Sequence, residues 1–432
     1  MLNERRFAPL FWTQFFSAFG DNVLKNALVF VILHQMGARG EALVTLAGGV
    51  FIAPFVFMSG LGGQLADRFD KAAMTRALKT AELGVALLAA IGFMANSVAI
   101  LFVALFLYGV IAALFGPVKY GILPDILRPQ ELGAGNALIE GATFLAILLG
   151  TIAGGLTAAD GTNASTPAIA IVALAALCWA TSRFIPAQAP AAPNLAIDRN
   201  ILRSTAVLVR MLSADRSLWR TGVLVSFFWL VGAVVLSLLP PLVKSHLGAS
   251  DESVTVFLAV FAIAIAVGSA GGAALMQGRI DLRSLPWAAL AMAAFALDAS
   301  LSLPARIGDM ASRPLAQLLL DPASWRAVID LGGLAIAGGI FVVPTFAALQ
   351  AWAPRANRSR MIAAVNVLSA LFMVGGAVVV GALQASGVSL NALFGLVAAG
   401  CAGCAAWVFT MRADFSSRAA EKPPLSRDLS SA

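Results

Sequence analysis

Two residues of opposite charge stand in the middle of a long apolar stretch near the start of the chain. Asp21 and Lys25 are four positions apart, so a helix would place both on one face with the acid first, the better order for an ion pair. A charge at the centre of a bilayer costs at least about 2.5 kcal/mol, so each needs a partner or a wet cavity. We interpret the two residues as part of a surface that meets a polar headgroup. The alternative is a self-neutralised pair buried between helices.

Amide side chains extend these charges into a polar seam along the same expected helix. Positions 14, 21, 22 and 25 repeat at the helical period, and Asn26 directly follows Lys25. The residues expected to line a substrate site are therefore Gln14, Asp21, Asn22, Lys25 and Asn26.

A further intramembrane charge, Lys119, stands beside a proline in the segment FGPVKYGIL. Pro117 has no backbone N–H and Gly116 loosens the turn, so carbonyl groups are freed close to the lysine. Glu140 is expected at a similar depth in the adjoining span, with Asn136 one turn before it. The sequence predicts a contact between Lys119 and Glu140 near the inner gate, and it leaves open whether this contact is a static staple or a moving gate.

The segment GGQLADRFDKAAMTRALK, which follows the second apolar stretch, combines small, acidic and basic residues. Gly63 lets a helix end approach a neighbour closely, and Asp67 can accept hydrogen bonds from nearby helix N-termini. Arg68 and Lys71 belong to a basic run that would hold this loop at an anionic membrane surface.

The composition requires that membrane-spanning helices carry these residues. Of 432 residues, 60% are hydrophobic and 12% are charged, whereas soluble domains carry roughly 25% charged residues. A span needs about 20 apolar residues. Hydropathy indicates twelve spans, near 8–34, 42–64, 75–95, 98–123, 133–157, 167–186, 220–243, 254–277, 284–303, 327–350, 360–384 and 388–411. We expect an all-α membrane protein with twelve transmembrane helices in two pseudo-symmetric six-helix bundles.

The spans divide into six and six around a connection rich in Pro, Ala and Arg. We expect an N-terminal bundle over 1–186, a cytoplasmic linker over 187–219, a C-terminal bundle over 220–412 and a cytoplasmic tail over 413–432. Repeated features support the symmetry: FGP in the fourth span is echoed by FVVP in the tenth, and an outer insertion at about 304–325 accounts for the greater length of the second half.

The basic residues set the expected orientation. Connections on the side of the two termini hold 22 Lys and Arg, and connections on the other side hold 5. Because positively charged loops stay in the cytoplasm, both termini are expected there. Their distribution in short scattered runs also excludes a nucleic acid as partner, despite the net charge of +7.

Groups for metal binding or covalent catalysis are sparse. His34 and His246 each lie just beyond a span, and Cys178, Cys401 and Cys404 lie within apolar stretches. We expect no metal and no cofactor. A membrane enzyme would need a His, Ser or Asp constellation at a membrane surface, which the sequence lacks.

The segment around Asp67 resembles the signature loop of the major facilitator superfamily, Gly-x-Leu-Ala-Asp-Arg-x-Gly-Arg/Lys, with Asp70 in place of the later glycine. Further segments are similar to the lysophospholipid transporter family of bacterial inner membranes: FFSAFGDN (15–22), FGPVKYGILPDIL (115–127), GNALIEGATFLAILLGTIAGG (135–155) and GGIFVVP (338–344). The resemblance is strong over spans one to five, moderate at the tenth, and elsewhere extends to topology.

The resemblance implies that the chain moves lysophosphatidylethanolamine and related lysophospholipids from the outer to the inner leaflet, among membrane lipids. A separate lysophospholipid acyltransferase or acyl-carrier-protein synthetase partner would then restore the second acyl chain. We hypothesise that Asp21 engages the ammonium and Lys25 the phosphate, and that the apolar second half accommodates the tail. The alternative of the same type is a proton-coupled exporter of amphipathic drugs or metabolites with Asp21 as the protonatable group; a scaffold or receptor is the non-transporting alternative.

Overall fold

The computed structural model describes residues 1–158, 164–303, 313–318 and 320–420. Over these residues the chain is helical apart from turns, an irregular connection over 183–200 and one isolated bridge between Ala249 and Arg313. Within them, twelve helices are long and apolar enough to cross a membrane, which confirms the predicted number of spans. Residues 304–312 and 319 of the expected outer insertion, and 421–432 of the expected tail, lie outside the described residues.

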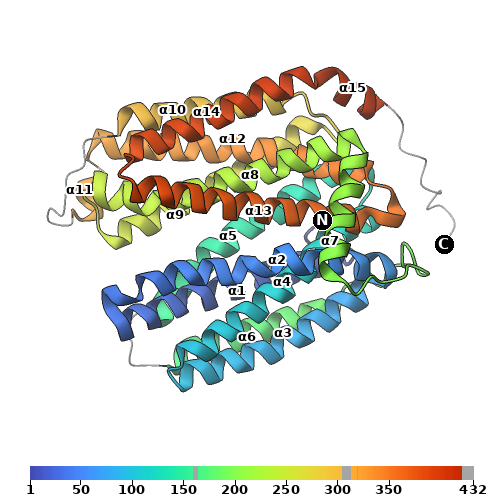
Figure 1. Cartoon of the computed structure of the whole chain (residues 1–432), viewed down its shortest axis with the longest axis horizontal. Coiled ribbons are helices and arrows are strands. Elements are labelled where there is room, and N and C mark those ends of the chain that lie inside the picture. The colour runs from blue at the N-terminus through green and yellow to red at the C-terminus, as the bar shows by residue number, and fades with distance from the viewer. Residues whose placement is uncertain (159–163, 304–312, 319, 421–432) are drawn as a thin grey trace.

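The membrane-spanning helices form two groups of six (Figure 1). The first group is α1 (Ala8–Met36), α2 (Glu41–Arg68), α3 (Lys71–Met94), α4 (Val98–Ile126), α5 (Leu132–Ala158) and α6 (Ser165–Ser182). The second group is α8 (Arg216–Pro241), α9 (Asp251–Met276), α10 (Leu285–Ser302), α12 (Pro322–Trp352), α13 (Arg358–Ala385) and α14 (Leu390–Thr410). Three shorter helices are α7 (Ile201–Ala214), α11 (Leu315–Leu318) and α15 (Arg412–Ala420). We call the two groups the first and the second half.

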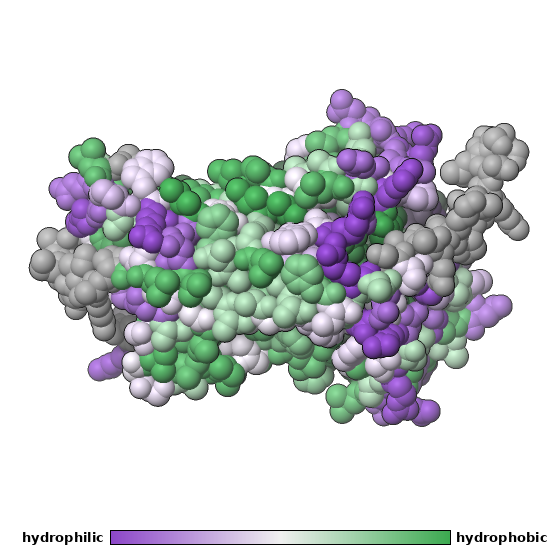
Figure 2. Space-filling model, turned by 90° about the horizontal axis from the view of Figure 1, so that it is seen from above, coloured by the Kyte–Doolittle hydropathy of each residue, from purple (hydrophilic) through white to green (hydrophobic). Residues whose placement is uncertain are grey.

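Figure 1 shows the start of the chain, α7 and α15 at one end of the molecule, which we call the terminal side. The helices of the two halves lie closest together there and diverge toward the opposite side. Figure 2 shows a broad hydrophobic belt around the middle, with polar residues gathered toward the two ends. This is the surface expected of a protein that spans a bilayer.

Acidic residues begin several helices in the way that helix dipoles favour. Asp70 precedes α3 and its carboxylate accepts hydrogen bonds from the N–H groups of Ala72 and Ala73 at 2.9 and 3.3 Å. Its Oδ1 also accepts from the N–H of Gln188 at 2.8 Å. The acid that replaces the signature glycine therefore caps α3 and ties down the connection between the halves.

The helix α7 lies inside the connection between the two halves, a segment in which no helix is predicted. Its buried side chains include Ser204, Leu208 and Leu212. Leu208 lies against Gly60 of α2 and Leu212 against Gly222 of α8. An apolar stripe that packs on one helix from each half explains why this segment is helical in the folded chain.

Glycines of α5 set the position of α1. A Cβ at Gly150 would lie 2.7 Å from the carbonyl oxygen of Phe19, and a Cβ at Gly154 would lie 2.7 Å from that of Val23. Only glycine allows two helix backbones to approach so closely. This contact fixes the rotation of the helix that carries Asp21.

Candidate substrate site and gate

The two charges at the middle of α1 are half-buried and do not pair with each other. Among the described residues, Asp21 and Lys25 make no hydrogen bond or ion pair, although their charges interact electrostatically. The direct pair that their spacing allows is therefore not formed. An acid and a base without a direct partner among the described residues therefore lie on the same face of α1.

Further charges of the first half surround Asp21. It interacts electrostatically with Glu82 and Lys79 of α3 and with Lys119 of α4. Lys79 Nζ lies 2.6 Å from Glu82 Oε2 and donates to Ser17 Oγ at 2.7 Å, with both charged side chains almost fully buried. These four residues and Lys25 form the charged interior of the first half.

Lys79 and Glu82 are functional candidates that the sequence interpretation missed. The sequence interpretation counts Lys79 with the basic residues of the connection before the third span and places Glu82 within a turn of the surface. The helix begins at Lys71, so both residues lie deeper and are buried. Their spacing of three positions on an apolar helix was the signal that pointed to an intrahelical ion pair.

Gln14 joins three helices. Its Nε2 donates to Thr143 Oγ1 of α5 at 2.7 Å, and its Oε1 accepts from Lys119 Nζ of α4 at 3.1 Å. Glu140 Oε1 accepts instead from the hydroxyl of Tyr120 at 2.6 Å. Among the described residues no hydrogen bond or ion pair joins Lys119 to Glu140, although their charges interact electrostatically.

The two asparagines of the seam face α5. Asn22 Nδ2 donates to the carbonyl oxygen of Ala18 at 2.8 Å, and Asn26 Nδ2 donates to that of Asn22 at 2.9 Å and to Thr151 Oγ1 at 3.2 Å. The structure thus brings Gln14, Asp21 and Lys119 into one polar region and turns Asn22 and Asn26 toward the glycine face of α5.

The halves are joined on the terminal side by the signature loop. Asp67, fully buried at the end of α2, accepts from the N–H groups of Ser359 and Arg360 at 3.0 and 3.2 Å, and from Arg360 Nε at 3.1 Å. Those N–H groups belong to the first turn of α13, where the helix dipole favours an anion. The expectation that Asp67 accepts from a helix N-terminus is confirmed. A Cβ at Gly63 would lie 2.9 Å from the Cα of Arg360, so glycine permits this approach.

A second acid, with one partner in each half, lies beside the first. Asp125 of α4 accepts from Lys71 at 2.8 Å and from Arg358 of α13 at 3.3 Å. Arg68 lies over the ring of Phe69, 5.3 Å from its centroid, and takes no part in this bridge. Asp125 cannot be recognised as a residue of this contact from the sequence alone, because its partners are on other helices.

Neutral contacts complete the junction. Asn136 of α5 and Gln350 of α12 exchange two hydrogen bonds, at 2.7 and 3.0 Å. The rings of Tyr120 and Phe346 stack with centroids 4.5 Å apart. We call the contacts of Asp67, Asp125, Asn136 and Tyr120 across the halves the terminal-side junction. Of the residues expected at the gate, Asn136 is part of this junction and Lys119 is not.

Deeper in the molecule, Phe144 of α5 stacks on Trp229 of α8, with centroids 5.9 Å apart. The aromatic residues at the start of the seventh span therefore pack between the halves.

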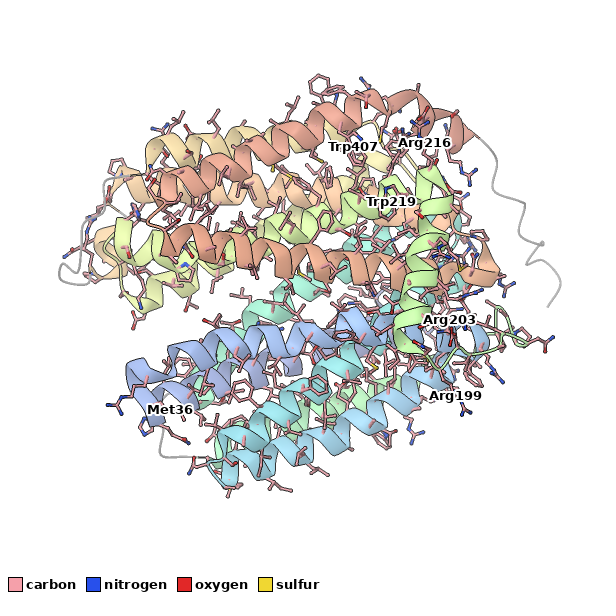
Figure 3. The ribbon with its side chains drawn as sticks, in the orientation of Figure 1. Met36, Arg199, Arg203, Arg216, Trp219 and Trp407 are labelled. Carbon is pink, nitrogen blue, oxygen red and sulfur yellow. The ribbon has the colours of Figure 1, made fainter. Side chains whose placement is uncertain are left out.

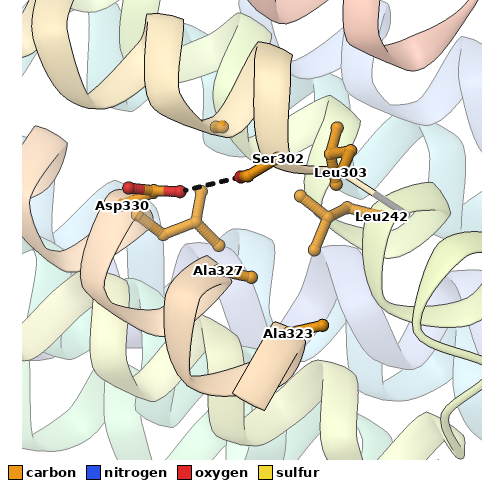
Figure 4. A pocket seen from close by; sticks show the side chains of 8 residues that line it. Leu242, Ser302, Leu303, Ala323, Ala327 and Asp330 are labelled. Atoms are coloured by element: carbon orange, nitrogen blue, oxygen red, sulfur yellow. Dashed lines mark hydrogen bonds between the residues drawn. The ribbon is translucent and has the colours of Figure 1, made fainter. Parts of the chain in front are cut away.

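One acid of the second half is buried within α12. Asp330 is 3% exposed and its nearest donor is Ser302 Oγ at 3.5 Å (Figure 4). The cavity beside it has a volume of about 10 Å³, which is near the minimum that holds one water molecule. It is too small for a lipid headgroup. Asp298 pairs instead with Arg326 in an exposed ion pair at 2.5 Å.

In the part of the chain that the structure describes, no group of three His, Cys, Asp or Glu side chains is placed to hold a metal ion. Cys178, Cys401 and Cys404 are free and buried.

Comparison with known proteins identifies the family to which this chain belongs. The sequence model of the Major Facilitator Superfamily matches residues 10–310. The lysophospholipid transporter LplT of Yersinia enterocolitica is 33% identical over 81% of this chain and 80% of its own length. The protein of the same name from Yersinia pestis is 32% identical over 81% and 79%.

Solved structures share the fold at low identity. The human organic anion transporter MFSD10 (TETRAN) superposes with a TM-score of 0.72 at 15% identity, over 93% of this chain and 98% of that one. The transporter FucP, solved in the outward conformation, gives 0.70 at 14% identity, over 96% and 99%. These matches support the two-half arrangement, and the sequence matches are closer. The chain therefore belongs to the major facilitator superfamily and, within it, to the family of lysophospholipid transporters.

Proposed function

We propose that the protein moves lysophospholipids, lysophosphatidylethanolamine among them, from the outer to the inner leaflet of a bacterial inner membrane, where a separate acyltransferase restores the second chain. The similarity to lysophospholipid transporters supports the substrate class. The observation that carries the proposal is the unpaired acid and base on one face of α1, inside the membrane-spanning part of the first half.

The headgroup of lysophosphatidylethanolamine matches this pair in charge and size. It carries a phosphate and an ammonium separated by two carbons. Residues four apart on a helix have Cβ atoms about 5–6 Å apart, so one small zwitterion can reach both. Asp21 engages the ammonium and Lys25 the phosphate, while Gln14 lines the site and Asn22 and Asn26 hold α1 against α5. The bound zwitterion supplies the direct ion pairs that Asp21 and Lys25 do not make within the described part of the protein.

The second half suits the acyl tail. No membrane-embedded charge like that of Asp21 occurs near the middle of its spans, and its side facing α5 carries Phe228 and Trp229. A single tail gains stabilisation from such a surface in proportion to the apolar area it removes from water. We place the tail against this surface while the headgroup stays with α1.

The terminal-side junction supports alternating access. Its contacts are formed, so this arrangement is closed on the terminal side. The division of basic residues between the two sides, 22 against 5, favours cytoplasmic termini. We infer that the state is closed toward the cytoplasm. Delivery to the inner leaflet then requires the halves to rock apart at Asp67, Asp125 and Asn136.

The test is leaflet-resolved translocation of labelled lysophosphatidylethanolamine by the purified full chain in vesicles. Asp21→Asn and Lys25→Ala should each lower the initial rate by at least about tenfold, since each removes a charge-assisted hydrogen bond. Asp281→Asn and Lys244→Ala, which change an acid and a base outside this site, are matched controls that should keep the wild-type rate.

Wild-type rates in both α1 variants would overturn the assignment of the headgroup site. Repeating the assay with and without a proton gradient separates the exporter alternative. Movement of amphipathic drugs that depends on the gradient, with no movement of lysolipid, would support the exporter and reject the lysolipid transporter.

A further inference from the structure

A basic hollow lies on the terminal side of the second half, away from the site on α1. It has a volume of about 260 Å³ and lies between the start of α8 and α15. Its lining residues are Arg216, Ser217, Arg220, Asp414, Ser417 and Arg418. Three guanidinium groups thus face a space that contains one carboxylate.

The wall formed by α15 is anchored. Phe415 is 4% exposed, and its ring stacks on that of Trp352 of α12 with centroids 5.9 Å apart. On the other side, Asp215 accepts from the N–H groups of Ser217 and Leu218 at 2.9 and 3.1 Å and so fixes the first turn of α8. The hollow is therefore held by packed elements on both sides.

The guanidinium groups are unequally satisfied. Arg220 is bound to Asp414, and this hydrogen bond lowers the pKa of the Asp414 carboxyl, so the acid stays charged. Arg418 pairs with Asp215 at 3.2 Å. Arg216 is exposed and makes no hydrogen bond or ion pair with any described residue. The lining keeps an excess of positive charge that its own acids do not neutralise.

Aromatic residues place this hollow at the level of the lipid headgroups. Trp219 is in the first turn of α8 and Trp407 in the last turn of α14, at the same end of the second half as Arg216 (Figure 3). Trp287, 59% exposed, meets the ring of Phe409 edge-on near the same end of α14. Tryptophans at the two ends of spans mark the interface between membrane and water.

We propose that this hollow binds the phosphate of an anionic phospholipid in the leaflet on the terminal side. Arginine presents paired N–H donors that match phosphate oxygens, and the hydroxyls of Ser217 and Ser417 supply further donors. Basic pockets at helix ends on the cytoplasmic side are suited to anionic headgroups. The acyl chains would lie along α8 and α14, below the tryptophans. This site goes beyond the proposed transport function, because it lies in the other half and holds a lipid that is not moved.

The experiment measures the melting temperature of the detergent-solubilised full chain during titration with dioctanoyl phosphatidylglycerol. Dioctanoyl phosphatidylcholine and inorganic phosphate form two further arms at the same concentrations. The glycerol lipid should stabilise the protein, and the choline lipid should not. Arg216→Gln and Arg418→Gln should each weaken the apparent affinity by about tenfold, as expected for the loss of one charge-assisted hydrogen bond. Arg203→Gln, an exposed arginine on α7, should leave it unchanged.

Asp414→Asn gives a test of opposite sign. It removes the acid that occupies Arg220, so affinity for the anionic lipid should rise several-fold, whereas a purely structural role for this ion pair predicts a loss. Arg216→Lys retains the charge and separates loss of the ligand from misfolding. Equal stabilisation by inorganic phosphate would show a soluble anion as the ligand and overturn the lipid assignment, and unchanged affinity in both glutamine variants would overturn the site.

Discussion

The buried pair Lys79 and Glu82 shows how the first half keeps charges inside a membrane. The two side chains are 0% and 2% exposed, and Lys79 also lies over the ring of Phe115, with Nζ 4.0 Å from its centroid. Each charge is satisfied by the other and by Ser17. Asp21 and Lys25 lack this mutual satisfaction. We propose that this difference separates charges that stabilise the fold from charges that bind the headgroup.

Breaking the buried pair should therefore destabilise the protein without touching the ligand site. Lys79→Met or Glu82→Leu alone should lower the free energy of unfolding by about 3–5 kcal/mol, because each leaves an uncompensated buried charge. The double variant should recover most of that loss. Unfolding followed by circular dichroism in one detergent measures all three; single variants as stable as the wild type would contradict the result.

An exchange of charges tests the relation between Lys119 and Glu140. Lys119 donates to Gln14 and Glu140 accepts from Tyr120, so Lys119→Glu with Glu140→Lys places each charge against an unsuitable partner. We expect lysolipid translocation to fall at least about tenfold, since two hydrogen bonds to charged groups are lost. The same exchange at the exposed pair Asp298 and Arg326 should be tolerated, because exposed pairs contribute about 0–1 kcal/mol. Full transport after the first exchange would contradict this expectation and support a direct, static contact between Lys119 and Glu140.

The site residues that can be recognised from the sequence alone are those whose charge costs free energy in the middle of a membrane span. Asp21 and Lys25 stand out because charge is rare in the middle of an apolar span. Asp125 and Gln350 did not stand out, because their meaning depends on partners in the other half; the Asn136 and Gln350 pair joins positions 214 apart. Helix periodicity places a residue on a face, but it does not say which distant helix that face meets.

At the scale of elements, α5 determines where the ligand site lies because its glycines allow α1 to approach. Gly150→Ala or Gly154→Ala puts a Cβ within 2.7 Å of an α1 carbonyl oxygen. Overpacking of this kind should cost about 1–3 kcal/mol of unfolding free energy, exceeding the gain in helix propensity of up to about 1 kcal/mol. Gly84→Ala on α3, where an added Cβ meets nothing within 4 Å, is the control and should be neutral or stabilising. Thermal unfolding compares the three variants, and equal stability in all of them would contradict close packing of α1 on α5.

Hydropathy located the spans to within a few residues, because length and apolar content are properties of the segment alone. The connection between the halves was different. Its helix α7 has an apolar stripe of Leu208 and Leu212 too narrow to stand out among Pro, Ala and Arg, and the stripe finds its partners only when α2 and α8 are already side by side. Elements whose stability comes from tertiary contacts are the ones that local pattern misses.

At the scale of the whole molecule, the different chemistry of the two halves requires them to move relative to each other during transport. The first half carries the charged interior and the second offers an apolar face, so a headgroup on α1 reaches the terminal side only if the junction there opens. A covalent lock across the junction should therefore stop transport without altering the site. Gly121 of α4 and Ser359 of α13 suit such a lock, because a Cβ at Gly121 would lie 3.4 Å from the Cβ of Ser359. A disulfide joins Cβ atoms about 3.5–4.5 Å apart.

We expect Gly121→Cys with Ser359→Cys to form a disulfide on mild oxidation and to lose lysolipid translocation, with recovery when the bond is reduced. The backbone N–H of residue 359 remains, so the hydrogen bond to Asp67 is retained. Each single variant, treated with the same oxidant, serves as control and should keep its activity, since the native cysteines are buried. Binding of lysolipid from the opposite side should persist in the locked protein, because Asp21 and Lys25 do not belong to the junction. Undiminished translocation with the disulfide fully formed would show that the terminal side need not open, and the rocking of the two halves would have to be abandoned.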